Sequence, residues 1–246
     1  VVFLPRHGRG HRLPPTAINF RANIDALKRA GVTDVLSFSA VGSLREDLAP
    51  GAFVIVDQFI DRTFARAKTF FGTGLAAHVS MARPVCARLG DAVEAAARGT
   101  GLPVTRGGTY ITMEGPQFST LAESLLYRSW GCDVIGMTNM PEAKLAREAE
   151  LCYATVAMVT DFDTWHDGHD DVTVEMIVKV LSGNAEKAAS LARGVLPALQ
   201  GRETPCPGGC DRALDSAVIT APDRRDPQLA ARLSAVAGRV LGDPEG

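Results

Sequence analysis

Short apolar runs alternate with segments of helical spacing along most of the chain. Apolar runs of about four to eight residues are typical of strands buried on both faces. The sequence therefore predicts strands over residues 35–40, 53–56, 109–112, 133–136 and 152–159. Helical spacing and helix-boundary residues predict helices over 19–30, 84–98, 120–130, 141–148, 172–199 and 226–241. The opening segment, Val1–Arg6, has the pattern of a strand end that runs into a charged loop.

This alternation predicts an α/β fold whose mixed, largely parallel twisted sheet is covered by helices. Ligands of such folds bind at the carboxyl ends of the strands. Four segments follow a predicted strand and should meet there, namely 39–40, 114–119, 137–138 and 161–163. Proline and glycine become frequent after about residue 200, so we expect a catalytic domain over 1–200 and a C-terminal extension over 201–246 that packs on or near it.

The composition is that of an ordinary globular protein. Hydrophobic residues make up 46% and charged residues 22%, and 26 basic against 28 acidic side chains give a net charge of −2. This balance provides no basic field for nucleic acid. The apolar runs are shorter than the roughly 20 residues that span a bilayer. A small-molecule partner is therefore expected, with neither nucleic acid nor membrane.

The cysteines are few and scattered. None of them has clear zinc-finger spacing with a histidine, and the number is too small for a disulfide scaffold. A reducing, cytoplasmic location is expected, together with no metal and no organic cofactor. Cys206 and Cys210 are close enough in sequence for a small disulfide loop or part of a metal site, although a free or weakly paired couple is favoured.

Two aspartates follow the most apolar run of the chain. Asp161 and Asp163 alternate along a strand, so they should point to the same side, about 7 Å apart along the chain. Solubility does not require two carboxylates at the end of a buried strand. The pair could serve a metal ion, a sugar or a base.

Six segments resemble, in order, those of the 5'-methylthioadenosine phosphorylases, members of the trimeric purine nucleoside phosphorylase superfamily. They are Arg6–Gly8, Ser39–Arg45, Asp57–Thr63, Glu114–Ser119, Gly136–Thr138 and Asp161–Asp163. The resemblance is strong over residues 1–200 and looser beyond. It implies a purine nucleoside phosphorylase-like single domain and a homotrimer or dimer of trimers. The implied reaction converts 5'-methylthioadenosine and inorganic phosphate to adenine and 5-methylthioribose 1-phosphate, in purine and methionine salvage.

The resemblance also implies a phosphate site. A planar arginine fork such as that of Arg6 suits phosphate, and His7 lies beside it in sequence. Ser39 with the backbone of Ala40, and Thr138 at the start of a helix, would add hydroxyl and amide donors. The family's first phosphate element, a glycine-rich loop followed by a hydroxyl residue, would precede Arg6 together with a strand. Neither is in this sequence, and a truncated chain is the expected reason.

At the base end, Asp161 is expected to protonate N7 of the departing purine, with a pKa raised by desolvation. Asp163 would accept a hydrogen bond from the exocyclic amino group. Three neighbours would complete the base site: Phe118 by stacking, Ser119 at the base edge, and Phe162. Relatives that act on 6-oxopurines carry asparagine where Asp161 stands, so adenine is favoured over hypoxanthine and guanine.

The 5' substituent of the sugar would be recognised by one face of a helix, formed by Val174, Ile177 and Val178. Relatives that bind a 5'-hydroxyl carry histidine where Ile177 stands, so an apolar residue indicates the methylthio group. Met137 would cover the ribose, and His78 would approach the 5' end from a neighbouring subunit.

Three alternatives stay open at this point. A methylthioinosine or general purine nucleoside phosphorylase is nearest. A metal-dependent glycosyltransferase could use the two aspartates to hold a divalent ion, although it would need further oxygen ligands. The third is a non-catalytic purine-binding protein.

Overall fold

The computed structural model describes residues 1–166, 174–200 and 205–242. Among these, seven strands form one sheet in the order β3-β5-β6-β1-β7-β2-β4. The strands are β1 (Asp34–Ser43), β2 (Phe53–Ile55), β3 (Gln58–Asp61), β4 (Val104–Arg106), β5 (Thr109–Thr112), β6 (Val134–Gly136) and β7 (Cys152–Phe162). Neighbouring strands are antiparallel in β1/β6 and β2/β7 and parallel in the other pairs. The predicted mixed, largely parallel sheet is confirmed.

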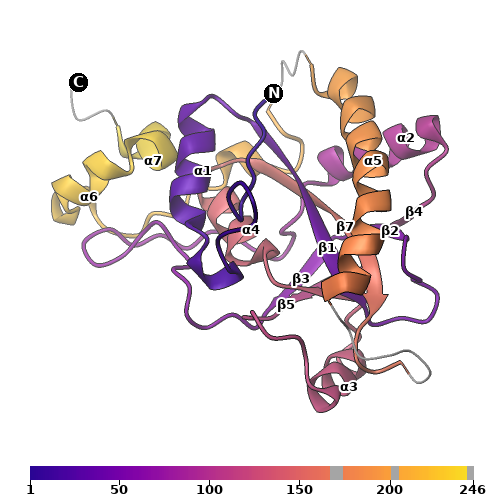
Figure 1. Ribbon diagram of the computed structural model, residues 1–246. Helices are drawn as coiled ribbons and strands as arrows, with labels where there is room; N and C mark the ends of the chain where they lie inside the picture. The colour runs from indigo at the N-terminus through magenta and orange to yellow at the C-terminus, as the bar shows by residue number, and fades with distance from the viewer. Residues whose placement is uncertain (167–173, 201–204, 243–246) are drawn as a thin grey trace.

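Helices cover the sheet on both sides (Figure 1). They are α1 (Phe20–Arg29), α2 (Ala87–Thr100), α3 (Leu121–Ser129), α4 (Asn139–Glu148), α5 (Val174–Leu199), α6 (Pro227–Arg232) and α7 (Ser234–Leu241), with short 3-10 helices at Pro15–Ala17, Cys210–Arg212 and Pro222–Arg224. Helices α2 and α5 share one core with β2 and β7, whereas α1, α4 and α7 share another. Thr120 and Glu123 form the predicted capping box of α3.

Within the described part of the chain, no helix combines the length and the apolar character that crossing a lipid bilayer requires.

The two central strands position the site. Strands β1 and β7 run parallel from the Asp34–Cys152 pair to the Ser43–Phe162 pair, with a register shift between Val41 and Gly42. Alternate residues of β7 enter the cores on opposite faces of the sheet. Burial of both faces accounts for the unbroken apolar run. Both strands are longer than predicted, so Ser39 and Asp161 lie on the strands themselves rather than just past them.

Two predicted elements differ from the structure: one predicted strand is not formed, and one predicted helix is divided in two. Residues 1–5 are not a strand, because their backbone is paired with no neighbouring strand, and Val1 and Phe3 are 87% and 83% exposed. The predicted helix 226–241 is divided into α6 and α7 at Leu233, whose backbone leaves the helical region while its side chain is buried in the core. Strands β3 and β4 were missed, because Gln58–Asp61 and Val104–Arg106 contain polar and charged residues and form no apolar run.

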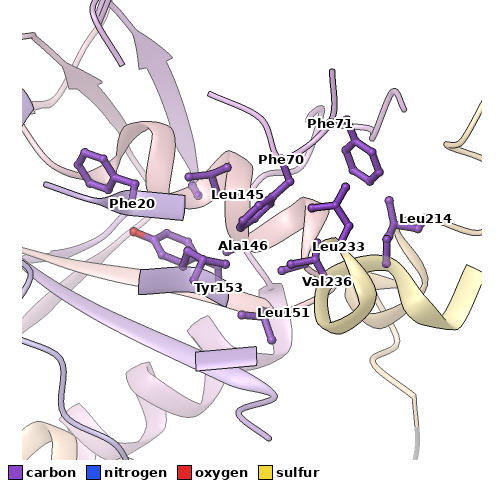
Figure 2. Close-up of a cluster of buried hydrophobic side chains, with 14 of the residues drawn as sticks. Phe20, Phe70, Phe71, Leu145, Ala146, Leu151, Tyr153, Leu214, Leu233 and Val236 are labelled. Atoms are coloured by element: carbon purple, nitrogen blue, oxygen red, sulfur yellow. The ribbon is translucent and has the colours of Figure 1, made fainter. Parts of the chain in front are cut away.

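The described part of the C-terminal extension packs onto the main core. Leu214, Leu233 and Val236 belong to the same buried cluster as Leu145 of α4 and Tyr153 of β7 (Figure 2). The division into a domain over 1–200 and an extension over 201–246 stays a prediction.

Candidate active site

Asp161 and Asp163 lie together beside the end of β1. Gly42 pairs with Asp161 in the sheet, and a Cβ on this glycine would come within 3.1 Å of Asp161 Oδ2 and 3.4 Å of Asp163 Cβ. A larger residue would therefore crowd both aspartates. Asp161 and Asp163 are only 7% and 5% exposed. The predicted side-by-side carboxyls are present, and glycine is what allows them to approach β1.

Burial is the main influence on the Asp161 carboxyl. The Thr160 hydroxyl lies 3.1 Å from the carbonyl oxygen of Val41 and 2.6 Å from Asp161 Oδ1, and it can donate its one proton to either oxygen. Donation to Asp161 favours the charged carboxylate, whereas burial favours the protonated form. Burial, opposed by Thr160 and reinforced by the charge of Asp163, raises the pKa of Asp161 to about 6.

Asp163 offers a buried acceptor. Within the described residues, its Oδ2 has no hydrogen-bond partner. Burial raises the pKa of Asp163, although the nearby hydroxyls of Ser124 and Ser119 favour its charged form. No third side chain of the described chain joins the two aspartates in a group that could hold a metal ion. This geometry fits a purine amino group better than a divalent cation.

The predicted base platform is only partly assembled. Phe118 follows β5 and is 38% exposed, so one face is open for stacking, and Ser119 is buried. Phe162 lies between the aspartates in sequence but alternates to the other face of β7, where its ring stacks on His166 at 4.4 Å. Ser119 is thus a neighbour of Asp163, the stacking role of Phe118 stays a prediction, and strand alternation turns the ring of Phe162 away from the carboxyls.

Three hydroxyls meet at the predicted phosphate end. Ser39 Oγ lies 3.1 Å from the Tyr110 hydroxyl and 3.3 Å from Thr138 Oγ1, and Ala40 follows Ser39 on β1. Burial raises the pKa of Tyr110. A Cβ at Gly136 would lie 1.9 Å from the Tyr110 oxygen, so this glycine makes room for the phenol. Sequence reasoning missed Tyr110 because a tyrosine in an apolar strand is typical of a core.

Arg6 is held at the same end by a buried ion pair. Its Nε and Nη2 donate to the two carboxylate oxygens of Glu142 at 2.9 and 2.8 Å. Nη2 also donates to Ser37 Oγ at 2.7 Å and Nη1 to the Phe38 carbonyl at 3.0 Å. Burial opposes the charge of Arg6, but Glu142 raises its pKa above the ordinary value. Arg6 is therefore fixed against β1 next to Ser39, and not a solvated surface arginine.

His7 is turned toward the chain beside it. Its Nδ1 lies 2.8 Å from the Leu13 carbonyl oxygen, to which it can donate, and its ring stacks on His11 at 4.0 Å. Burial lowers the pKa of His7. A neutral ring that donates through Nδ1 leaves Nε2 as an acceptor.

A second buried ion pair fixes Met137. Arg66 Nη1 donates to the Met137 carbonyl at 2.6 Å, while Nε donates to Glu114 Oε1 at 3.0 Å. Burial opposes the charge of Glu114, but hydrogen bonds from Thr16, two backbone amides and Arg66 lower its pKa to about 2. A Cβ at Gly115 would lie 2.4 Å from Met137 Sδ. Arg66 was missed because its partners come from distant segments.

The predicted 5' end is incomplete in one chain. Ile177 is half-buried and Val178 is 53% exposed, whereas the side chain of Val174 lies outside the described residues. His78 is exposed and lines a separate cavity of about 570 Å³ together with Arg83 and Arg147, away from every other predicted site residue. Its role from a neighbouring subunit stays a prediction.

Known proteins share both the sequence and the fold. The family model of the phosphorylase superfamily matches residues 1–197. S-methyl-5'-thioadenosine phosphorylase of Rhodospirillum rubrum is 68% identical over 98% of this chain and 82% of that protein. Its counterpart in Cereibacter sphaeroides is 66% identical over 98% of this chain and 83% of that protein.

Solved structures give the same result. A methylthioadenosine phosphorylase from an antarctic soil metagenomic library is 44% identical and superimposes with a TM-score of 0.88, covering 95% of this chain and 82% of that one. The Schistosoma mansoni methylthioadenosine phosphorylase in complex with adenine is 38% identical with a TM-score of 0.78, covering 82% of this chain and 76% of that one. Together with the paired aspartates and the hydroxyl cluster, these matches show that the chain belongs to the phosphorylase superfamily and, within it, to the S-methyl-5'-thioadenosine phosphorylases.

Proposed function

We propose that this protein catalyses the phosphorolysis of 5'-methylthioadenosine to adenine and 5-methylthioribose 1-phosphate. The observation that carries the proposal is the buried carboxyl of Asp161, whose pKa is raised by burial and which lies beside the acceptor Asp163. The names of the two bacterial relatives, and adenine in the Schistosoma mansoni structure, support the same reaction.

In the proposed step, a phosphate oxygen forms a bond to the anomeric carbon while the bond from that carbon to N9 breaks. The bonding electrons pass to the purine, and Asp161 delivers its proton to N7, so that adenine leaves neutral. Asp163 accepts a hydrogen bond from the amino group of adenine. Asp161 then regains a proton from solvent. Because an anionic purine is a poor leaving group, this proton transfer supplies most of the chemical assistance at the base end.

Phosphate would be held by the groups that converge at the other end. Ser39 and Thr138 offer hydroxyls, and the Ala40 backbone amide follows the part of β1 that Arg6 holds at Ser37 and Phe38. We assign His7 to the same end, with Met137 over the ribose and Ile177, Val178 and Val174 toward the methylthio group. Inorganic phosphate is a co-substrate, and the reaction as written needs no organic cofactor.

The finer assignments rest on the same geometry. We propose a homotrimer, because His78 lies away from the strand ends of its own chain and the 5' end lacks a full wall. A cytoplasmic location and a role in purine and methionine salvage follow from the substrate. A methylthioinosine or general purine phosphorylase is disfavoured by the carboxyl at position 161, since a mismatched buried polar group costs up to about 10⁴ in specificity.

A direct assay tests the proposal. The purified protein is given methylthioadenosine, methylthioinosine, adenosine and inosine, each with and without phosphate, and the bases are separated by chromatography. Phosphate-dependent release of adenine, fastest from methylthioadenosine, is expected. Release that does not depend on phosphate would mean a hydrolase, and faster release of hypoxanthine would mean an inosine-type phosphorylase. Purine binding without any release would mean a non-catalytic protein.

A further inference from the structure

Four of the five cysteines gather in one buried cluster. Cys86 lies at the start of α2, Cys152 at the start of β7, and Cys206 and Cys210 in the C-terminal extension. Their four sulfur atoms all lie within 4.8 Å of one another. The fifth, Cys132, belongs to a different buried cluster with Ile111, Tyr127 and Trp165. The cluster is therefore formed by four cysteine side chains from three distant segments of the chain.

The spacing of the sulfur atoms fits a single tetrahedral ion. Zinc bound by four thiolates at about 2.3 Å places the sulfurs about 3.8 Å apart. Cys86 Sγ and Cys206 Sγ are 3.6 Å apart, and no pair exceeds 4.8 Å. All four residues are buried, so no open coordination position faces solvent, which is typical of a structural rather than a catalytic ion. We propose that Cys86, Cys152, Cys206 and Cys210 bind one structural Zn²⁺ ion.

The surroundings stabilise thiolates. Cys86 is the N-cap of the 14-residue helix α2, whose N-terminus carries a partial positive charge. Arg147 adds a positive charge near Cys210. Zinc and four thiolates carry a net charge of −2, so a helix N-terminus and a guanidinium are suitable neighbours for the site.

The loop that carries two of the sulfurs is shaped for this arrangement. The Gly209 amide donates to the Cys206 carbonyl at 2.8 Å, and Gly209 has a φ of +68°, a conformation that a residue with a side chain rarely adopts. The Cys206 amide donates to the Asp211 carboxylate at 2.9 Å. This turn places both sulfurs of the loop on the side of Cys86 and Cys152.

The ion would attach the extension to the catalytic sheet. Cys152 begins the 11-residue strand β7, and Asp161 lies near the other end of the same strand. Leu214, four residues after Cys210, belongs to the same buried cluster as Leu145 and lies near Leu233 (Figure 2). The Ala217 carbonyl accepts a hydrogen bond from the His78 amide at 2.9 Å. Loss of zinc should therefore loosen the extension and the segment that bears His78, while the strand ends stay in place.

Sequence spacing did not indicate this site, because only Cys206 and Cys210 are neighbours along the chain. Two other states of the same four sulfurs are chemically possible. Oxidation would join them as two disulfides, which requires an oxidant and sulfur atoms about 2.05 Å apart. In a reducing location they could also stay as four thiols without metal. Both states are outcomes of the test below.

The test measures metal and thiols on the intact chain. Zinc is determined by mass spectrometry on protein purified without chelator, and free thiols are titrated in denaturant with chelator present. One zinc ion and five reactive thiols per chain are expected. A metal-free protein that also fails to take up added zinc overturns the proposal, and a single reactive thiol overturns it in favour of two disulfides.

Two further measurements separate a four-thiolate site from adventitious zinc. Co²⁺ put in place of zinc should give the intense sulfur charge-transfer and tetrahedral ligand-field bands of a four-thiolate site, and weak octahedral bands would contradict it. Cys206→Ser and Cys210→Ser should lower zinc affinity at least tenfold, whereas Cys132→Ser, a buried cysteine outside the cluster, should keep one zinc per chain. The cobalt spectrum of the unmodified chain decides the matter if a variant fails to fold.

Discussion

The two ends of the candidate site differ in whether their buried charged groups have a partner of opposite charge. At the phosphate end, Arg6 is paired with Glu142, and Ser39 is bonded to both Tyr110 and Thr138. At the base end, within the described part of the chain, neither Asp161 nor Asp163 forms an ion pair with a basic side chain, and Asp163 Oδ2 has no hydrogen-bond partner there. At the phosphate end the charges are paired, and the donors are in position before an anion binds. At the base end, an ionised carboxylate would be buried without an opposite charge.

This difference separates stability from catalysis. A buried carboxyl without a cation costs folding free energy, but the same desolvation keeps its proton available for the leaving base. A paired arginine costs little and holds its donors in position before phosphate arrives. Changes at the base end should therefore impair chemistry and improve stability, whereas changes at the phosphate end should impair phosphate binding and stability together.

The largest effect is expected at Asp161. Asp161→Asn removes the general acid, so kcat/KM for methylthioadenosine should fall by about 10²- to 10⁴-fold, while activity on 6-oxopurine nucleosides is kept or rises. Burial raises the pKa of Asp161 from 3.8 to about 6. Because the folded pKa exceeds the unfolded one, stability from protonation is present below pH 4 and lost as the pH rises through about 6.

The stability of the same variant sharpens the comparison. At pH 7.5 the Asp161→Asn variant has no ionised carboxylate at this buried position. The free energy of unfolding of the variant should therefore exceed that of the parent protein by on the order of 3 kcal/mol. Urea denaturation at pH 7.5 measures this, with Asp223→Asn, whose side chain is 75% exposed, as the control that should change neither quantity. Adenine release at the parental rate would show that Asp161 is not the acid.

The second prediction concerns pH. If the protonated form of Asp161 is the active one, kcat/KM for methylthioadenosine should follow its protonated fraction, which falls about 50-fold between pH 6 and pH 8 for a pKa of about 6. Dividing the profile by that of Asp161→Asn removes the titration of phosphate itself. A ratio that stays constant over this range would contradict the role of this carboxyl.

The third prediction tests the phosphate end. Arg6→Gln removes charge-assisted donors worth about 1.5–3 kcal/mol, so KM for phosphate should rise by about 10- to 100-fold. The exposed neighbour Arg9→Gln is the matched control and should leave KM unchanged. Glu142→Gln keeps Arg6 but replaces its ion pair by a weaker neutral hydrogen bond. This variant should lose more stability than phosphate affinity. A loss of stability in Arg6→Gln with an unchanged phosphate KM would make the ion pair purely structural.

The contrast between the two ends also explains what the sequence could predict. Asp161 and Asp163 were predictable because strand alternation and a buried apolar run are local properties of the chain. Glu142, by contrast, lies 136 positions from Arg6, and Arg66 reaches Met137 across 71 positions. No local pattern marks such partners. Tyr110 was not predicted for another reason. Its ring packs in the hydrophobic core, and only its hydroxyl lies at the phosphate end.

Two errors have the same physical origin. Val1–Arg6 has the composition of a strand, but a strand exists only when a neighbour accepts its backbone hydrogen bonds, and composition does not show neighbours. Phe162 was counted with the substrate site for its place between two aspartates, although strand alternation turns its ring onto His166. The identity of each element was predictable, whereas pairing across the fold was not.

The fourth prediction is a smaller effect at the phosphate end. Tyr110→Phe keeps the buried ring and removes one neutral hydrogen bond to Ser39, worth about 1 kcal/mol, so KM for phosphate should rise by about fivefold. Tyr127→Phe changes a buried tyrosine of another cluster and is the control. If both variants shift KM for phosphate equally, the Tyr110 hydroxyl does not position Ser39.

The smallest effect is expected at the sugar, outside both charged ends. Ile177 is half-buried on α5, and Ile177→His would replace the apolar side chain that we propose to face the 5' position with a hydrogen-bond donor. A neutral hydrogen bond to a 5'-hydroxyl is worth about 0.5–1.5 kcal/mol, so the ratio of kcat/KM for adenosine to that for methylthioadenosine should rise by about 2- to 10-fold. Glu186→His, on an exposed position of the same helix, controls for a histidine on α5. Since neither carboxyl nor phosphate contact changes, the pH profile and KM for phosphate should stay parental. A shift in either would mean that α5 acts on the charged ends rather than on the 5' group.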